Sequence, residues 1–142
     1  MNKLLFPLWL GLAGSPAHAC GDLNISDAWV RAAPPTASVM AGYLTLSNDG
    51  AEPVTVTAAA SPSFERVEMH DMTHEDGVMR MRKLDQVQIA AGAKAEFVPG
   101  GRHLMLIQPK GAFAVGDQIE VTLTLCGEHA QVVKLPVREA GG

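Results

Sequence analysis

Hydrophobic and polar positions alternate along most of the chain after residue 20. The clearest case is 118–125, where Ile119, Val121, Leu123 and Leu125 would share one face of an extended strand. Similar runs rich in Val, Ile, Leu, Thr and aromatic residues recur between turn signals. These runs predict nine strands, at 23–30, 40–47, 53–59, 64–70, 78–84, 95–98, 103–108, 118–126 and 131–137.

Gly, Pro, Asn and Asp clusters separate the runs, as at Pro34-Pro35 and Pro99-Gly100-Gly101. No window shows a helical period with capping residues. Many short strands joined by frequent turns are typical of two-sheet and closed-barrel folds. The pattern therefore predicts an all-β single domain, built as a Greek-key β-sandwich or barrel.

The first 19 residues have the layout of a cleaved secretory signal peptide. Lys3 precedes a short apolar run, and Ala17-His18-Ala19 provides a small-residue cleavage site. The apolar run is shorter than the roughly 20 residues that a membrane-spanning helix needs. We therefore expect a leader at 1–19, a functional domain at 20–138, a flexible tail at 139–142 and a periplasmic location with no stable membrane span.

Cysteine usage offers two interpretations for Cys20, which would be the first residue after cleavage. A lipoprotein also begins with cysteine, but Ala17 stands where a large aliphatic residue usually precedes a lipidated cysteine. Cys126 is the other cysteine of the chain, and in an oxidising compartment the two can close a disulfide. Such a bridge typically adds about 2–4 kcal/mol to stability.

The charge of the chain is acidic overall. Its formal net charge is −4 at pH 7, and loss of Lys3 with the leader would make it one unit more negative. Nucleic-acid binding relies on a basic face. The sequence therefore predicts no nucleic-acid partner.

Methionine and histidine gather in two stretches. Four of the seven methionines lie between residues 69 and 81, close to His70, and a second group begins at His103. Side chains alternate along a strand, so His103 and Met105 would share a face, as would Met79 and Met81. With a loop at 71–77 returning the chain beside His70, four ligands could converge at one rim of the barrel: His70, Met81, His103 and Met105.

The ligand types indicate which metal would bind. Thioethers are soft and neutral, and imidazole suits copper and zinc alike, so two histidines with two methionines favour Cu(I). Methionine does not form disulfides, which suits a compartment outside the cytoplasm. Met72 would share a strand face with His70, and Met79 with Met81, so both are secondary candidates.

The spacing of these residues resembles that of the periplasmic copper chaperones called PCu(A)C. Ten residues separate His70 from Met81, and twenty-one separate Met81 from His103-Leu104-Met105, as in that family. The segments 27–31, 42–46, 77–82 and 99–106 also look like the family, so the resemblance covers the chain after residue 19. It implies a cupredoxin-like fold and the four ligands named above.

The resemblance also implies a non-enzymatic function. Members supply copper to cytochrome c oxidase, chiefly its dinuclear copper-A centre, so we expect that subunit, and other copper chaperones, as partners. Two alternatives stay open: a blue-copper electron-transfer protein using Cys126 and the nearby His129, and a thiol reductase that supports copper-A assembly. The second lacks the usual Cys-x-x-Cys motif.

Overall fold

The computed structural model describes residue 11 and residues 20–141, so the predicted leader lies, apart from Gly11, outside the described residues. Within these residues every regular element is a strand and none is a helix, so no described helix could cross a membrane. The strands are β1 (Asn24–Arg31), β2 (Val39–Ser47), β3 (Val54–Ala60), β4 (Phe64–Glu75), β5 (Val78–Leu84), β6 (Val87–Ile89), β7 (Lys94–Phe97), β8 (His103–Pro109), β9 (Gln118–Leu125) and β10 (His129–Arg138).

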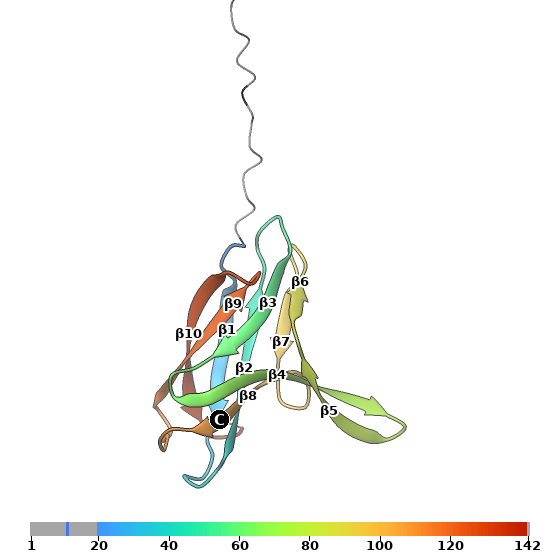
Figure 1. The fold of residues 1–142 in the computed structure, drawn as a ribbon. Helices are drawn as coiled ribbons and strands as arrows, with labels where there is room; N and C mark the ends of the chain where they lie inside the picture. Colours follow the sequence, from blue (N-terminus) through green and yellow to red (C-terminus); the bar gives the residue numbers. More distant parts are fainter. Residues whose placement is uncertain (1–10, 12–19, 142) are drawn as a thin grey trace, which may run out of the picture.

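Seven strands close into a barrel. Following hydrogen-bonded neighbours, the order runs β4-β8-β2-β1-β10-β9-β3, and a further pairing of β3 with β4 closes the ring. β1 and β10 run parallel, and the other pairings are antiparallel. β6 extends the sheet beyond β3, and β7 pairs with β2 (Figure 1). The prediction of an all-β, single-domain barrel is confirmed.

The barrel interior is filled by the alternating residues of each strand. On β9, Ile119, Val121, Leu123 and Leu125 are all 1% exposed or less, as the alternation predicts. Burying such a side chain is worth about 1.5–3 kcal/mol relative to exposing it. The buried interior therefore stabilises the barrel, and the side chains on its outer face can serve binding instead of packing.

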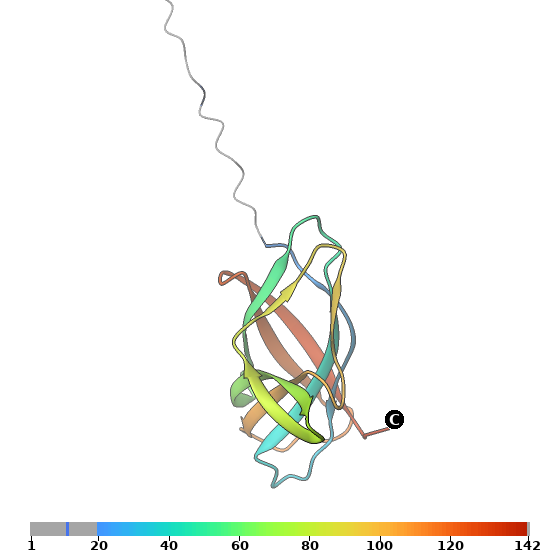
Figure 2. The same ribbon diagram turned by 90° about the vertical axis from the view of Figure 1, so that its right-hand side faces the viewer.

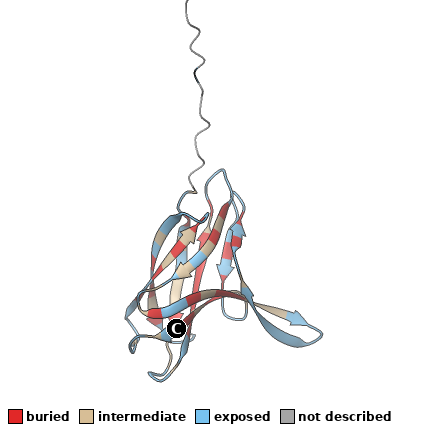
Figure 3. Cartoon of the chain, in the orientation of Figure 1, coloured by how far each residue is buried: buried red, intermediate tan, exposed pale blue. Residues whose placement is uncertain are grey.

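The hairpin formed by β4 and β5 projects away from the barrel (Figures 1 and 2). β5 hydrogen-bonds only to β4 among the described strands, and six of its seven residues are exposed (Figure 3). Because β4 continues past the barrel wall, its second half forms one side of this hairpin.

The predicted loop at 71–77 is wrong, because β4 continues as a strand to Glu75. Asp76 and Gly77 alone make the turn, with φ values of 51° and 76°. Two consecutive residues with positive φ match the right-handed twist of a hairpin, and Asp-Gly favours this turn. This part of β4 lies outside the core, so residues 71–75 do not need to alternate between apolar and polar side chains. Without that alternation the sequence does not indicate a strand there.

Other predicted strand limits differ by a few residues, and β6 was missed altogether. β6 has only three residues, too few for an alternating pattern to be recognised, although Val87 and Ile89 are both buried. The structure joins Cys20 to Cys126 in a disulfide, which ties the start of the domain to the turn between β9 and β10.

Candidate metal centre

The four predicted ligands lie on one face of the sheet formed by β5, β4 and β8. His70 and His103 are cross-strand partners on β4 and β8, and Met105 lies two residues along β8 from His103. Met81 on β5 is the cross-strand partner of Met72, which lies two residues along β4 from His70. Residues two apart on a strand share a face, so the structure brings all four to the same side.

His70 lies at the centre of this arrangement. It is directly opposite His103, and it is diagonal to Met105, whose own partner is Glu68. It is also diagonal to Met81 across the hairpin. Diagonal neighbours in a sheet are about 7–8 Å apart, within the reach of long side chains. The expectation that His70 lies beside the Met79–Met81 strand holds, but Lys83 is its direct partner there.

The side chain of His70 is held by a carboxylate. It is 8% exposed, and its Nε2–H donates to Oε2 of Glu68 at 2.8 Å. Its Nδ1 is buried and has no hydrogen-bond partner among the described residues. A buried polar atom without a partner is costly and rare in proteins. A carboxylate on one ring nitrogen with the other nitrogen free is the usual arrangement around a metal-binding histidine.

Glu68 connects this histidine to nearby cations. Its Oε1 lies 3.3 Å from Nε of Arg66 and 3.7 Å from Nζ of Lys83. The hydrogen bond from His70, together with the charge of Lys83, lowers the pKa of Glu68 against the opposing effect of burial. Glu68 therefore stays ionised and fixes the orientation of the His70 ring.

His103 is held in a similar way by the backbone. Its Nδ1–H donates to the carbonyl oxygen of Gly101 at 3.2 Å, and the residue is 9% exposed. This bond leaves the lone pair of Nε2 free. The ring centroids of His70 and His103 are 5.6 Å apart. The two rings stack at an interplanar angle of 27°, so the structure sets the two imidazoles side by side.

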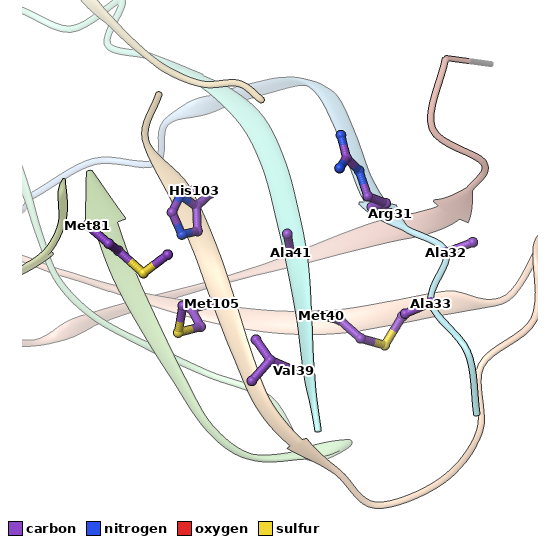
Figure 4. Close-up of a pocket in the computed structure, with 9 residues that line it drawn as sticks. All are labelled: Arg31, Ala32, Ala33, Val39, Met40, Ala41, Met81, His103 and Met105. Carbon is purple, nitrogen blue, oxygen red and sulfur yellow. The ribbon is translucent and has the colours of Figure 1, made fainter. Parts of the chain in front are cut away.

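A hollow of about 280 Å³ lies beside His103. Met81 reaches from β5 toward Met105 and His103 on β8 (Figure 4). The other wall is formed by Arg31 at the end of β1, by Ala32 and Ala33 just after it, and by residues 39–41 of β2. Met81 is 51% exposed, whereas the two histidines are buried. The site is therefore open on its methionine side, which lets a ligand from another molecule approach.

The donor set decides which ions the site fits. Two neutral imidazoles and two thioethers carry no charge, and thioethers bind soft ions such as Cu(I) in preference to Mg(II) or Ca(II). Among residues 20–141, no group of three or more His, Cys, Asp or Glu side chains is placed to hold a metal ion. The residues present thus fit a soft, monovalent ion.

The secondary candidates lie on the outer hairpin. Met72 and Met79 share the face of His70, and Met79 is 48% exposed. His74, which falls within the predicted loop at 71–77, is instead on β4 opposite Met79 and is exposed. The sequence interpretation missed Glu68. Its position two residues before His70 on a predicted strand could have indicated it, because that spacing puts both on one face.

The chain folds as a small cupredoxin-like β-barrel that carries a candidate methionine–histidine metal site on β4, β5 and β8. Comparison with solved structures agrees on the fold. The copper-bound PCuAC domain from PmoF2 superposes with a TM-score of 0.69 at 20% identity, covering 86% of this chain and 97% of that one. Apo-DR1885 from Deinococcus radiodurans gives 0.65 at 26% identity, covering 99% and 95%.

Sequence comparison identifies the family. The family model described as "Putative lipoprotein LpqE-like" matches residues 23–137, and the chain belongs to this family, the PCuAC-related copper chaperone domains. A relative named "Putative lipoprotein Lxx21020" from Leifsonia xyli subsp. xyli is 28% identical over 92% of this chain and 78% of its own length. An uncharacterized protein of Rickettsia prowazekii, RP573, is 28% identical over 86% and 68%.

Proposed function

We propose that this protein is a Cu(I)-binding metallochaperone that works outside the cytoplasm and delivers copper to the copper-A centre of cytochrome c oxidase. The ion is cargo, held by His70, Met81, His103 and Met105, called the inner set below. One observation carries the proposal. The Nδ1 of His70 is buried and has no hydrogen-bond partner among the described residues, and His70 shares one face of the sheet with two thioethers and with a second imidazole whose Nε2 is free.

The chemistry of the inner set supports transfer as well as binding. Thioether ligands are neutral, so an incoming donor can replace them without protonation. Met81 is half exposed while both histidines are buried, so an acceptor would reach the methionine side first. A solved structure of DR1885 holds Cu(I), which supports the same oxidation state here.

The cysteines and the predicted leader support the proposed location of the protein. A disulfide between Cys20 and Cys126 suits an oxidising compartment such as the periplasm. The relatives named as lipoproteins support export. In this chain the sulfur of Cys20 is bonded to Cys126, and a lipid anchor would use that same sulfur. We therefore propose a periplasmic protein released by cleavage after Ala19.

The two alternative functions both need a cysteine thiolate. A blue-copper centre requires a thiolate ligand, and a thiol reductase requires a reactive pair of thiols. Cys20 and Cys126 are the two cysteines of the chain and are joined to each other. Cys126 follows the end of β9, which pairs with β10 and β3 and not with the strands β4, β5 and β8 that carry the inner set. The disulfide therefore favours the chaperone over both alternatives.

Two measurements test the proposal. A competition titration with a Cu(I) chelator should show one tightly bound Cu(I) per chain and a much weaker uptake of Zn(II). The loaded protein is then mixed with a purified apo copper-A domain, whose optical spectrum reports copper arrival. If the protein binds Cu(I) tightly but does not transfer it to this domain, Cu(I) binding would stand and the copper-A domain would not be the recipient. Absence of tight binding would overturn the function.

A further inference from the structure

The β4–β5 hairpin presents more soft donors than the inner set uses. Beyond His70, the same face of β4 carries Met72 and then His74. On β5, Met81 is the partner of Met72, and Met79 is the partner of His74. The hairpin thus continues the line of sulfur and imidazole donors away from the barrel and toward the turn at Asp76–Gly77.

These outer methionines do not serve the packing of the core. Met79 is 48% exposed on a strand whose partner is β4 alone among the described strands. Met69, on the opposite face of β4, shows the contrast, because it is 4% exposed and belongs to the hydrophobic core. Methionine normally fills gaps inside cores. An exposed methionine opposite an exposed histidine therefore calls for another explanation.

The register places these donors close enough to share an ion. Side chains directly opposite each other have Cβ atoms about 5 Å apart, and methionine is long and flexible. Successive same-face positions along a strand are about 7 Å apart. Met81 is opposite Met72 and diagonal to both His70 and His74. It lies between the barrel end and the outer end of this line.

We propose that Met72, His74 and Met79 form an outer Cu(I) position on the hairpin, and that Met81 passes the ion between it and the inner set. This proposal rests on the proposed function. During the passage a bond from copper to an outer sulfur or nitrogen breaks as a bond to an inner ligand forms. The ion remains Cu(I), and no proton or electron moves.

The outer position would solve a problem of access. His70 and His103 are 8% and 9% exposed and Met81 is 51% exposed, so a partner protein would meet the methionine before the inner nitrogens. The hairpin projects from the barrel and is exposed along β5 (Figures 1 and 3). A partner that docks at the hairpin could take copper from Met79 and His74, while the inner set refills them through Met81.

The test compares a double variant, His74→Gln with Met79→Leu, with the control Val78→Leu. Val78 is 52% exposed and neighbours Met79 on β5, but it points to the other face of the hairpin. Three readouts are used on the purified protein: Cu(I) affinity by chelator competition, the rate of Cu(I) release to excess chelator by stopped flow, and methionine-methyl NMR during titration with Cu(I).

In the unmodified protein, the first equivalent should shift the methyl signals of Met81 and Met105, and a second should shift those of Met72 and Met79. The double variant, which has no methyl signal from residue 79, should keep the tight first affinity, show no shift of Met72 with the second equivalent and release copper several-fold more slowly. The control should match the unmodified protein in all three readouts.

Each contrary outcome has a distinct meaning. Unchanged release and an unchanged second-equivalent shift of Met72 in the double variant would overturn the outer position while leaving the proposed function intact. A loss of the tight first affinity in that variant would place His74 or Met79 in the inner set and overturn the two-position arrangement. Absence of tight binding in the unmodified protein would overturn the proposed function itself.

Discussion

His70 and His103 face each other across β4 and β8, with ring centroids 5.6 Å apart and each ring held by one hydrogen bond. Glu68 holds the Nε2 of one ring, and the Gly101 carbonyl holds the Nδ1 of the other. The free nitrogens are therefore of different kinds, Nδ1 in His70 and Nε2 in His103. The register of β4 and β8 thus sets the two imidazoles side by side.

Replacing either methionine of the inner set should weaken Cu(I) binding. We expect Met81→Leu and Met105→Leu each to lower the Cu(I) affinity at least about tenfold. Loss of a residue that only hydrogen-bonds to a metal ligand already lowers metal affinity by about 10-fold or more, and loss of a ligand should cost no less. Met81 is half exposed, so its replacement should change the free energy of unfolding by only about 0.5 kcal/mol or less. Chelator competition and urea denaturation measure the two quantities.

The matched control for these variants is Met69→Leu. Met69 is buried in the core on the opposite face of β4, so its replacement should cost less than about 1.5 kcal/mol of stability and leave Cu(I) affinity unchanged. If all three leucine variants bind Cu(I) like the unmodified protein, the thioethers of residues 81 and 105 are not ligands.

Removing the carboxylate behind His70 should lower affinity without removing a ligand. Glu68→Ala deletes the acceptor of the Nε2–H bond, and loss of such a partner typically costs about 10–100-fold in metal affinity. Glu68→Gln keeps an oxygen acceptor and should cost less. Lys83→Gln removes a neighbouring charge but leaves the bond to His70, so it serves as the control. Equal affinity in all variants would contradict a role for Glu68.

The same carboxylate predicts a dependence of stability on pH in the metal-free protein. The pKa of Glu68 is lowered in the folded state, first by the hydrogen bond from His70. Its stabilising contribution is therefore complete above the ordinary glutamate pKa and is lost as the pH falls through the lower, folded-state value. The stability difference between the unmodified protein and Glu68→Gln should be present at neutral pH and shrink in this acidic range. Urea denaturation at several pH values measures it, and a difference that grows on acidification would contradict the assignment.

The disulfide should stabilise the fold without affecting the metal centre. Cys20 and Cys126 are 106 residues apart in sequence, so the bridge restrains most of the unfolded chain. Replacing both by serine should lower the free energy of unfolding by about 2–4 kcal/mol. Cu(I) affinity should be unchanged, because both cysteines border a hollow beside residues 52–55, whereas Met81, His103 and Met105 line a different one.

Mass spectrometry of the exported protein provides an independent check on the cysteines. The expected mass is that of the chain from Cys20 with one disulfide and no lipid, because both modifications need the same sulfur. A lipid-modified Cys20 would mean that the bridge does not form in the cell and that Cys126 carries a free thiol.

The spacing of residues along the chain was enough to identify several features. Alternation in segments such as 118–125 predicted the core face of β9, and the intervals between His70, Met81 and His103 predicted a ligand set and a family. These features are local, or are simple distances along the sequence. Which face of a strand a side chain lies on also depends only on its position along that strand, so the shared face of His103 and Met105 could be predicted as well.

Only the tertiary structure decided how the strands meet. The register that places Met81 opposite Met72, and His70 opposite both His103 and Lys83, depends on pairings between distant segments and on the two-residue turn at Asp76–Gly77. A shift of one residue would turn every side chain of β5 to the other face. The burial that leaves Nδ1 of His70 without a partner likewise arises only when β4 and β8 come together, because no short segment of sequence contains both strands.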